Sequence, residues 1–156
     1  MLIPGAALLL KEAGFCFRWY LVGDGSLRPQ LEQEIERLKL KDSVILLGAK
    51  VNPYPYMKNC DVYVQTSYTE ASCTTLREAK CFSCIRVATD FENAFEEIED
   101  GKNGLIAKKT SESLAEKIGT VLSSPERYRI ESVDRNKEAK ESDLDKLYCY
   151  IEGFGT

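Results

Sequence analysis

Short apolar runs alternate along this chain with segments whose apolar residues recur at helical spacing. Residues 17–22 form the first such run and are closed by Gly23, and residues 44–47 form the second and are closed by Gly48. The segment between them carries an amphipathic pattern made by Leu27, Leu31, Ile35 and Leu38. Such alternation is typical of βαβ crossovers, so the sequence predicts an α/β fold with a Rossmann-like parallel sheet and helices on both faces.

The same alternation continues to about residue 122. We expect further strands at residues 61–65, 85–88 and 105–107, and helices at residues 6–13, 74–82 and 94–98 and from Ser111 onward. Pro53 and Pro55 bracket what is predicted to be a short connection. The first recognisable element is a helix, so the opening strand of the sheet is expected to be missing. Residues 1–156 are therefore predicted to form a single domain, with its core in residues 6–122 and a C-terminal helical segment at residues 125–156.

The composition excludes several classes of protein. The 156 residues carry 21 Lys+Arg against 25 Asp+Glu, a formal charge of −4, which argues against a nucleic-acid binder. The absence of histidine excludes histidine-based triads and imidazole metal sites. The six cysteines are scattered, and the Cys81–Cys84 pair lacks the second pair that zinc needs. We therefore expect reduced, structural thiols in a cytoplasmic protein without a metal site.

Residues 66–79 are the most informative strand-end segment. They follow a predicted strand and run into a predicted helix, and residues 71–75 are small or polar, which leaves the amides at the helix start accessible. A helix N-terminus binds anions, so a pyrophosphate can sit there without a metal. Glu70 and Glu78 can accept hydrogen bonds from sugar and ribose hydroxyls. On spacing alone, however, the better explanation is a helix-start acid at Glu70 and a surface helix residue at Glu78.

Taken in order, these segments resemble the C-terminal, nucleotide-sugar-binding half of retaining GT-B glycosyltransferases of the group 1 (family 4) kind. The resemblance covers roughly residues 6–122. It rests on residues 20–25, residues 44–48, residues 56–64, the E-x7-E motif of Glu70 and Glu78 followed by Ala79, and residues 100–105, which match a D-G-x-N-G-L turn.

The resemblance implies a binding site for a nucleotide-diphosphate sugar. Glu70 would face the sugar hydroxyls as the catalytic carboxylate, Glu78 would hold the ribose, and Gly23 would let the backbone approach the donor. The other donor-binding positions implied are Gly48, Ala49 and Lys50 beside the base, and Ala71, Ser72, Cys73, Thr74 and Thr75 beside the sugar and phosphates. Such enzymes retain the anomeric configuration, commonly explained by a front-face reaction in which the leaving phosphate assists the acceptor hydroxyl. Neither a protein nucleophile nor a metal is then required.

The chain also departs from the family pattern. Ala71 replaces a glycine, Glu92 and Asn93 replace a Gly-Gly pair, and residues 83–87 replace Gly followed by Pro-Val-Val. The family's phosphate-binding Gly-Arg and Lys segment would precede residue 6, and we expect it and the acceptor-binding N-terminal domain to be missing. We therefore expect this chain alone to bind the donor weakly and not to transfer sugar. The partners implied are a nucleotide-sugar donor and a glycan or lipid-linked acceptor held by the absent domain, in polysaccharide biosynthesis.

A non-catalytic α/β module of the receiver or flavodoxin-like kind is the alternative from another class. A receiver requires an acidic pair after its first strand and a phosphoacceptor aspartate after a middle strand. The predicted strands are followed instead by Gly23, Gly48, Thr66-Ser67 and Thr89-Asp90, which does not fit. A degenerate transferase half that is kept for binding stays open as a third hypothesis, because of the departures from the family pattern.

Overall fold

The structure is a computed structural model that describes residues 1–70, 73–82 and 84–128. Its elements in chain order are α1 (Leu2–Glu12), β1 (Trp19–Val22), α2 (Arg28–Arg37), β2 (Val44–Gly48), α3 (Tyr54–Asn59), β3 (Val62–Gln65), α4 (Thr74–Cys81), β4 (Ile85–Thr89), α5 (Ala94–Glu97), β5 (Leu105–Ala107), α6 (Ser111–Ser123) and a 3₁₀ helix (Pro125–Tyr128). The predicted alternation of strands and helices is confirmed.

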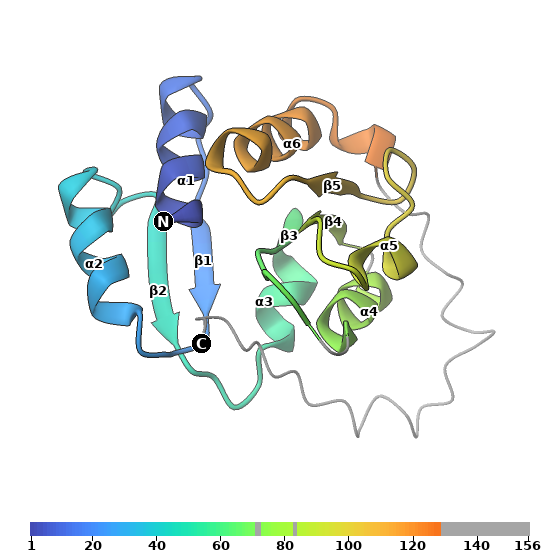
Figure 1. Cartoon of the computed structure of the whole chain (residues 1–156), viewed down its shortest axis with the longest axis horizontal. Coiled ribbons are helices and arrows are strands. Elements are labelled where there is room, and N and C mark those ends of the chain that lie inside the picture. The colour runs from blue at the N-terminus through green and yellow to red at the C-terminus, as the bar shows by residue number, and fades with distance from the viewer. Residues whose placement is uncertain (71–72, 83, 129–156) are drawn as a thin grey trace.

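The described strands form two parallel sheets where the sequence predicted one (Figure 1). β1 pairs with β2, with Trp19 opposite Val44, while β4 lies between β3 and β5, with Val62 of β3 opposite Ile85. In the usual doubly wound order, 3-2-1-4-5-6, the first strand separates the second from the fourth. Within the described residues no strand precedes α1, so nothing fills that central position and β1 and β3 share no ladder.

Helix α1 joins the two sheets into one body. Ala7 is fully buried in a cluster formed with α2, β1 and β2. The neighbouring Ala6 is fully buried in a second cluster formed with β4, β5 and α6. Helix α1 accordingly lies between α2 and α6 (Figure 1), and adjacent residues of the same helix pack against different sheets.

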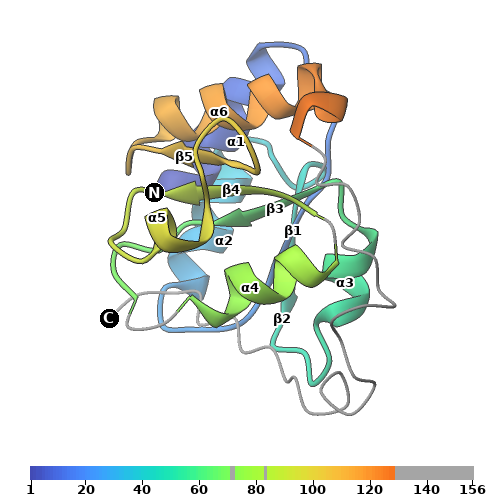
Figure 2. The same ribbon diagram turned by 90° about the vertical axis from the view of Figure 1, so that its right-hand side faces the viewer.

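Helices cover both faces of the β3–β4–β5 sheet, as predicted (Figure 2). Leu10 of α1 and Leu114 of α6 pack on one face. Met57 of α3, Leu76 of α4 and Ala94 of α5 pack on the other. Every residue of β4 is buried, which is the pattern of a strand at the centre of a parallel sheet covered on both sides.

Helix α1 ends at the glycine that the sequence predicted as its stop. Gly14 has a φ of +85°. Its N–H donates to the Lys11 carbonyl at 3.0 Å, and the Phe15 N–H donates to the Leu10 carbonyl at 3.1 Å. These two bonds form a Schellman motif, which satisfies carbonyls that the last helical turn leaves without partners.

One local prediction is wrong. Pro53 and Pro55 do not bracket a connection but lie at the start of α3. The first turn of a helix tolerates proline, because the N–H groups there have no helical acceptor.

Helix α6 begins at Ser111 as predicted, and its cap is Thr110, whose hydroxyl accepts from the Ser113 N–H at 3.2 Å. The helix predicted at residues 125–156 is described only as far as the 3₁₀ helix, and residues 129–156 lie outside the described residues.

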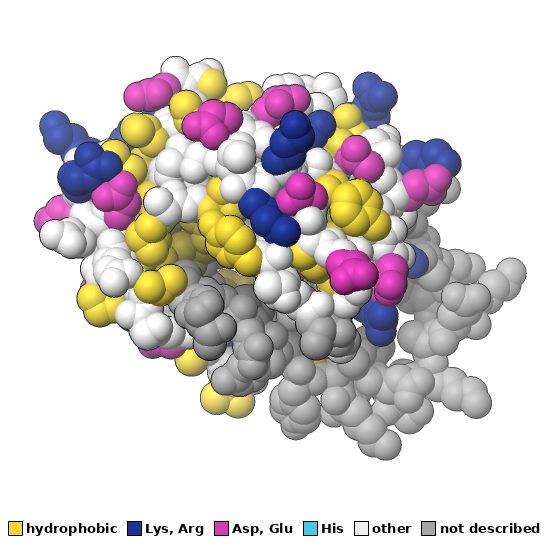
Figure 3. All heavy atoms as spheres, in the orientation of Figure 1, with side chains coloured by type: hydrophobic (Ala, Val, Ile, Leu, Met, Phe, Trp, Pro, Cys, Tyr) yellow, Lys and Arg dark blue, Asp and Glu magenta, His cyan; other side chains and the backbone are white. Residues whose placement is uncertain are grey.

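The described residues display neither a membrane-spanning helix nor a patch of one charge sign on the face that Figure 3 shows. None of the described helices combines the length and the apolar character needed to cross a bilayer. Acidic and basic side chains are interspersed over the face in Figure 3. Nucleic-acid binders instead gather basic side chains on one face.

Gly5 marks a close approach of α1 to α6. A Cβ at this position would overlap Ser111 Oγ and would lie 2.9 Å from Ser111 Cβ. The Ser111 hydroxyl also donates to the Leu2 carbonyl at 3.0 Å, so the two helices are hydrogen-bonded at the same place. Glycine inside a helix costs roughly 1 kcal/mol relative to alanine, and here the contact with α6 leaves no room for a larger residue.

We expect Gly5→Ala to lower the free energy of unfolding by about 1–3 kcal/mol, because overpacking outweighs the gain in helix propensity. Gln33→Ala, at an exposed position of α2, is the control and should change stability by less than about 0.5 kcal/mol. Urea unfolding followed by circular dichroism measures both. A Gly5→Ala protein at least as stable as the parent would contradict the close packing of α1 on α6.

Candidate functional site

Gly23 and Gly48 shape the carboxyl ends of β1 and β2. Their φ angles are +136° and +70°, a region that glycine adopts without strain. The Gly23 N–H donates to the Gly48 carbonyl at 3.0 Å, which ties the two strand ends together. Ala49 and Lys50 follow Gly48 and are exposed. The structure therefore places all four predicted residues at the edge where a parallel sheet binds ligands.

A positive charge that was not singled out from the sequence lies beside these turns. Arg28, at the start of α2, pairs with Glu32 at 2.8 Å and with Asp24 at 3.4 Å. A Cβ on Gly48 would come within 3.3 Å of the Arg28 guanidinium. Any residue larger than glycine would therefore press against Arg28, whose guanidinium is held beside this turn by the carboxylates of Asp24 and Glu32.

Helix α4 begins in the segment predicted to bind an anion. Its N-cap is Cys73, whose carbonyl accepts from the Leu76 N–H at 3.1 Å and whose side chain makes no capping bond. Thr74 is exposed and Thr75 is buried in the first turn. The first N–H groups of a helix have no acceptor within it, so the positive end of α4 can receive an anion. The predicted residues Ala71 and Ser72 lie outside the described residues.

A buried hydrogen-bond network holds the Glu70 carboxylate. Its Oε1 accepts from Gln65 Nε2 and from the Ser67 hydroxyl. Gln65 Oε1 in turn accepts from the Tyr63 hydroxyl and from Thr75 Oγ1, the latter at 3.1 Å. Gln65 was not predicted as a site residue. The available signal was a polar residue that shares the buried side of a short strand with Tyr63.

The loop that carries Glu70 is anchored to β4 and to the segment before α5. The Thr89 hydroxyl donates to the Ser67 carbonyl at 2.5 Å. Asn93 Nδ2 donates to the Glu70 carbonyl at 3.0 Å. Asn93 stands where the family pattern has glycine, and its side chain supplies an anchor that glycine lacks. Both bonds hold the backbone around Glu70, whereas its carboxylate is held separately by the bonds from Gln65 and Ser67.

Glu78, the second acid of the E-x7-E motif, lies inside α4. It is 6% exposed and is one of the buried residues of that helix, together with Thr75. Residues three apart share a face of a helix, so Glu78 continues the face that Thr75 presents to the end of β3. The motif therefore places one carboxylate in the loop before α4 and the other along its buried face.

The predicted turn at residues 100–105 has a structural role. The Asp100 carboxylate accepts from the Ile106 N–H at 2.8 Å. A Cβ on Gly104 would lie 2.5 Å from the Arg86 carbonyl, so only glycine fits there. Arg86 is fully buried, its pKa is lowered by that burial, and its guanidinium donates to the Asn103 carbonyl at 3.1 Å. The turn therefore packs against β4 and β5 of the β3–β4–β5 sheet, and it contributes no side chain to the Glu70 network.

The cysteines form neither a zinc site nor a disulfide among the described residues. Cys81 is exposed while Cys84 is buried, so the two do not act as a pair. The Cys84 sulfur lies 3.7 Å from that of Cys60, and both thiols donate to the Met57 carbonyl. No group of three or more ligating side chains occurs in residues 1–70, 73–82 and 84–128.

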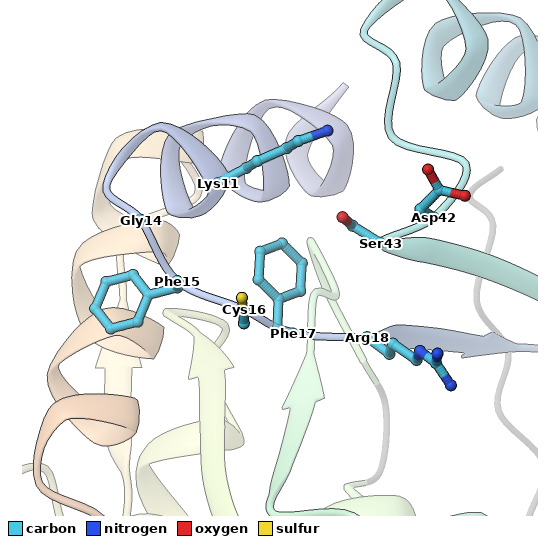
Figure 4. Close-up of a pocket in the computed structure, with 8 residues that line it drawn as sticks. All are labelled: Lys11, Gly14, Phe15, Cys16, Phe17, Arg18, Asp42 and Ser43. Atoms are coloured by element: carbon cyan, nitrogen blue, oxygen red, sulfur yellow. The ribbon is translucent and has the colours of Figure 1, made fainter.

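A surface hollow of about 540 Å³ lies at the opposite, amino end of the first sheet (Figure 4). Its lining comes from the end of α1 and from the residues that precede β1 and β2: Lys11, Gly14, Phe15, Cys16, Phe17, Arg18, Asp42 and Ser43. Lys11 Nζ is engaged with the Lys39 carbonyl at 2.9 Å. The Phe15 ring turns to α6, where a Cβ on Gly119 would lie 3.2 Å from it. None of the predicted donor-binding residues lines this hollow.

We expect Cys73 to resist alkylation although it lies at a helix N-terminus. Burial, followed by the nearby Glu70, raises the pKa of its thiol to about 11, so roughly one molecule in a thousand carries the thiolate at pH 8. Iodoacetamide at pH 8 should modify the exposed Cys16 and Cys81 while Cys73 stays unmodified, as read by peptide mass mapping. Modification of Cys73 as fast as that of Cys81 would contradict a buried, protonated thiol.

Known proteins are similar to this chain in sequence and in fold. Residues 6–141 match the family model described as glycosyl transferases group 1. A Campylobacter jejuni protein, the N-acetylgalactosamine-N,N'-diacetylbacillosaminyl-diphospho-undecaprenol 4-alpha-N-acetylgalactosaminyltransferase, is 33% identical over 94 residues, which cover 60% of this chain and 26% of the relative. A second Campylobacter jejuni relative, an alpha-1,4-N-acetyl-D-galactosaminyltransferase, is 29% identical over 140 residues, covering 88% of this chain and 38% of the relative.

Among solved structures, Anabaena Alr3699/HepE in complex with UDP and glucose has a similar fold. The two chains are 27% identical with a TM-score of 0.69, and the match covers 81% of this chain and 36% of the Anabaena chain. This chain therefore spans between 26% and 38% of the length of the three proteins. Because the family model matches residues 6–141, which are most of the sequence, this chain belongs to the group 1 glycosyltransferases, with a GT-B-type Rossmann-like fold.

Proposed function

We propose that this chain is the donor-binding domain of a retaining, metal-independent glycosyltransferase that uses a nucleotide-diphosphate sugar. The observation that carries the proposal is the position of the α4 N-terminus between two carboxylates, Glu70 in the loop before it and Glu78 along its buried face. An anion-binding helix end flanked by two hydroxyl acceptors matches the chemistry of a sugar, a pyrophosphate and a ribose in one molecule.

The pyrophosphate is assigned to the first turn of α4. The N–H groups of Thr74 and Thr75 and the positive end of the helix dipole would receive its charge. The Cys73 thiol beside them is protonated at neutral pH and adds no negative charge. On the side of the first sheet, Gly48, Ala49 and Lys50 would border the base, and the ammonium group of Lys50 is the cation assigned there. Phosphate charge can thus be balanced by groups of the protein.

The reaction assigned to the complete enzyme is a front-face displacement. The acceptor oxygen forms a bond to the anomeric carbon as the bond from that carbon to the phosphate oxygen breaks. The departing phosphate oxygen takes the proton of the acceptor hydroxyl, so no protein base is needed. Negative charge develops on the phosphate next to α4, where fixed N–H dipoles stabilise it. Glu70 would hold the sugar hydroxyls in place and orient the anomeric carbon.

Uracil is the base we assign to the donor, and a lipid-linked glycan is the acceptor class. The Anabaena structure contains UDP and glucose, and the first Campylobacter relative is named for a diphospho-undecaprenol acceptor. The acceptor would be held by a domain outside this chain, on the cytoplasmic side of a membrane. We infer that this chain alone binds the donor without transferring the sugar.

Isothermal titration of the chain with UDP, UDP-glucose and GDP tests the proposal. We expect UDP and UDP-glucose to bind and GDP to bind more weakly. Glu78→Gln should weaken UDP binding by about 1–3 kcal/mol, because a charged acceptor for the ribose hydroxyls is lost while the shape of the side chain is kept.

Glu116→Gln, at an exposed position of α6, is the matched control and should leave the affinity unchanged. Circular dichroism establishes that both variants are folded. The proposal is wrong if the folded parent binds neither UDP nor UDP-glucose at millimolar concentration, or if Glu78→Gln binds UDP as tightly as the parent does.

A further inference from the structure

We propose that Gln65 is a positioning residue for sugar recognition, which holds the Glu70 carboxylate toward the sugar hydroxyls and aligns it with helix α4. The inference rests on the proposed function, because it assigns Glu70 to the sugar of the donor. It adds a residue that lies outside the E-x7-E motif and that the resemblance does not include. Three observations carry it: the burial of Gln65, the use of all its hydrogen-bonding positions, and the elements that these bonds connect.

Gln65 is 6% exposed at the end of β3, and its amide group is fully used. An amide offers two N–H donors and two acceptor lone pairs. The nitrogen donates to the Ser67 hydroxyl at 2.9 Å and to Glu70 Oε1. The oxygen accepts from the hydroxyls of Tyr63 and Thr75. A carboxylate can only accept, so Glu70 requires the nitrogen on its side, and the two hydroxyls fill the other side.

Among the residues that the structure describes, the network engages only one of the two oxygens of the Glu70 carboxylate. Glu70 Oε1 accepts two hydrogen bonds, from Gln65 and from Ser67. Within the described part of the chain, no hydrogen bond or ion pair is formed by Oε2. Fixing Oε1 also fixes the plane of the carboxylate and therefore the direction of Oε2. A sugar hydroxyl that donates to Oε2 would meet an acceptor that is already oriented, which lowers the entropy lost on binding.

The same amide connects the sugar side of the site to the phosphate side. Thr75 belongs to the first turn of α4, to which the pyrophosphate is assigned, while Glu70 lies in the loop before that helix. Gln65 holds both from the buried side of β3. A buried and fully satisfied network resists rearrangement, because breaking one bond leaves a polar group unpaired away from water. Gln65 is thus placed to fix the position of the Glu70 carboxylate relative to the first turn of α4, to which the pyrophosphate is assigned.

The test compares UDP with UDP-glucose in the parent chain and in Gln65→Glu. Glutamate has the shape of glutamine. When ionised it can still accept from Tyr63 and Thr75, but it cannot donate to Glu70 and places a second negative charge beside it. We expect the parent to bind UDP-glucose more tightly than UDP. In Gln65→Glu the ratio of the dissociation constant for UDP to that for UDP-glucose should fall by roughly tenfold, while the affinity for UDP itself changes by less than about twofold.

Two further variants keep the test decisive. Gln33→Glu, at an exposed position of α2, adds the same charge away from the site and should change neither affinity. Should Gln65→Glu fail to fold, Ser67→Ala removes the other donor to Glu70 Oε1 and should also lower the preference for UDP-glucose. A substitution that merely destabilises the domain weakens the binding of both ligands and leaves the ratio of their dissociation constants unchanged. Only a substitution that acts on sugar recognition changes this ratio, because UDP does not contain the sugar.

A measurement without ligand tests the hydrogen bond itself. In ¹⁵N spectra, Glu70→Ala should shift the side-chain amide resonances of Gln65 by more than those of Gln33. A Gln65 shift no larger than that of Gln33 would overturn the inference. So would a parent that binds UDP-glucose no more tightly than UDP, or a Gln65→Glu variant in which the affinities for both ligands fall equally. Absence of any UDP binding would overturn the proposed function, and this inference with it.

Discussion

The packing of helix α1 between two sheets is the constraint on which the rest of the structure depends. No ladder links β1 to β3 in the described residues, so the sheets are held together by side-chain packing. Ala6 and Ala7 are both fully buried, one against each sheet, and small side chains let one helix lie close to both. The proposed site draws Gly23 and Gly48 from one sheet and Glu70 from the other. Their relative positions therefore depend on α1, which contains none of the predicted donor-binding residues.

Much of the fold follows from local signals, and the parts that do not follow depend on distant partners. Gly14 stops α1 because a left-handed residue closes a helix, and that preference is visible in the sequence alone. The order of strands and helices is equally local, since it rests on periodicity. The division into two sheets was not predicted, because pairing between strands is set by which chain segments meet. Helix α3 was missed because Pro53 and Pro55 were interpreted as the bounds of a connection, although prolines suit the first turn of a helix.

The candidate site shows the same division. The E-x7-E spacing and the helix start of α4 could be found from the sequence, and the structure places Glu70 and Glu78 at the loop and on the buried face. Gln65 could not be assigned, because its role comes from four partners on three segments that only the fold brings together. Asn93 and Arg86 interrupt the family pattern, and in the fold they anchor the loop and turn around the second sheet. Positions at which the chain departs from the family pattern therefore supply hydrogen bonds of their own.

The central claim is that the donor binds at the carboxyl ends of the strands, across both sheets. Mapping amide chemical shifts in ¹⁵N-labelled chain during titration with UDP-glucose tests it most directly. The account predicts that the largest shifts occur at Gly23, Gly48 and the first turn of α4, and that they saturate together at one dissociation constant. Shifts gathered around the hollow at residues 14–18, with none at α4, would contradict it and place the ligand at the amino end of the first sheet.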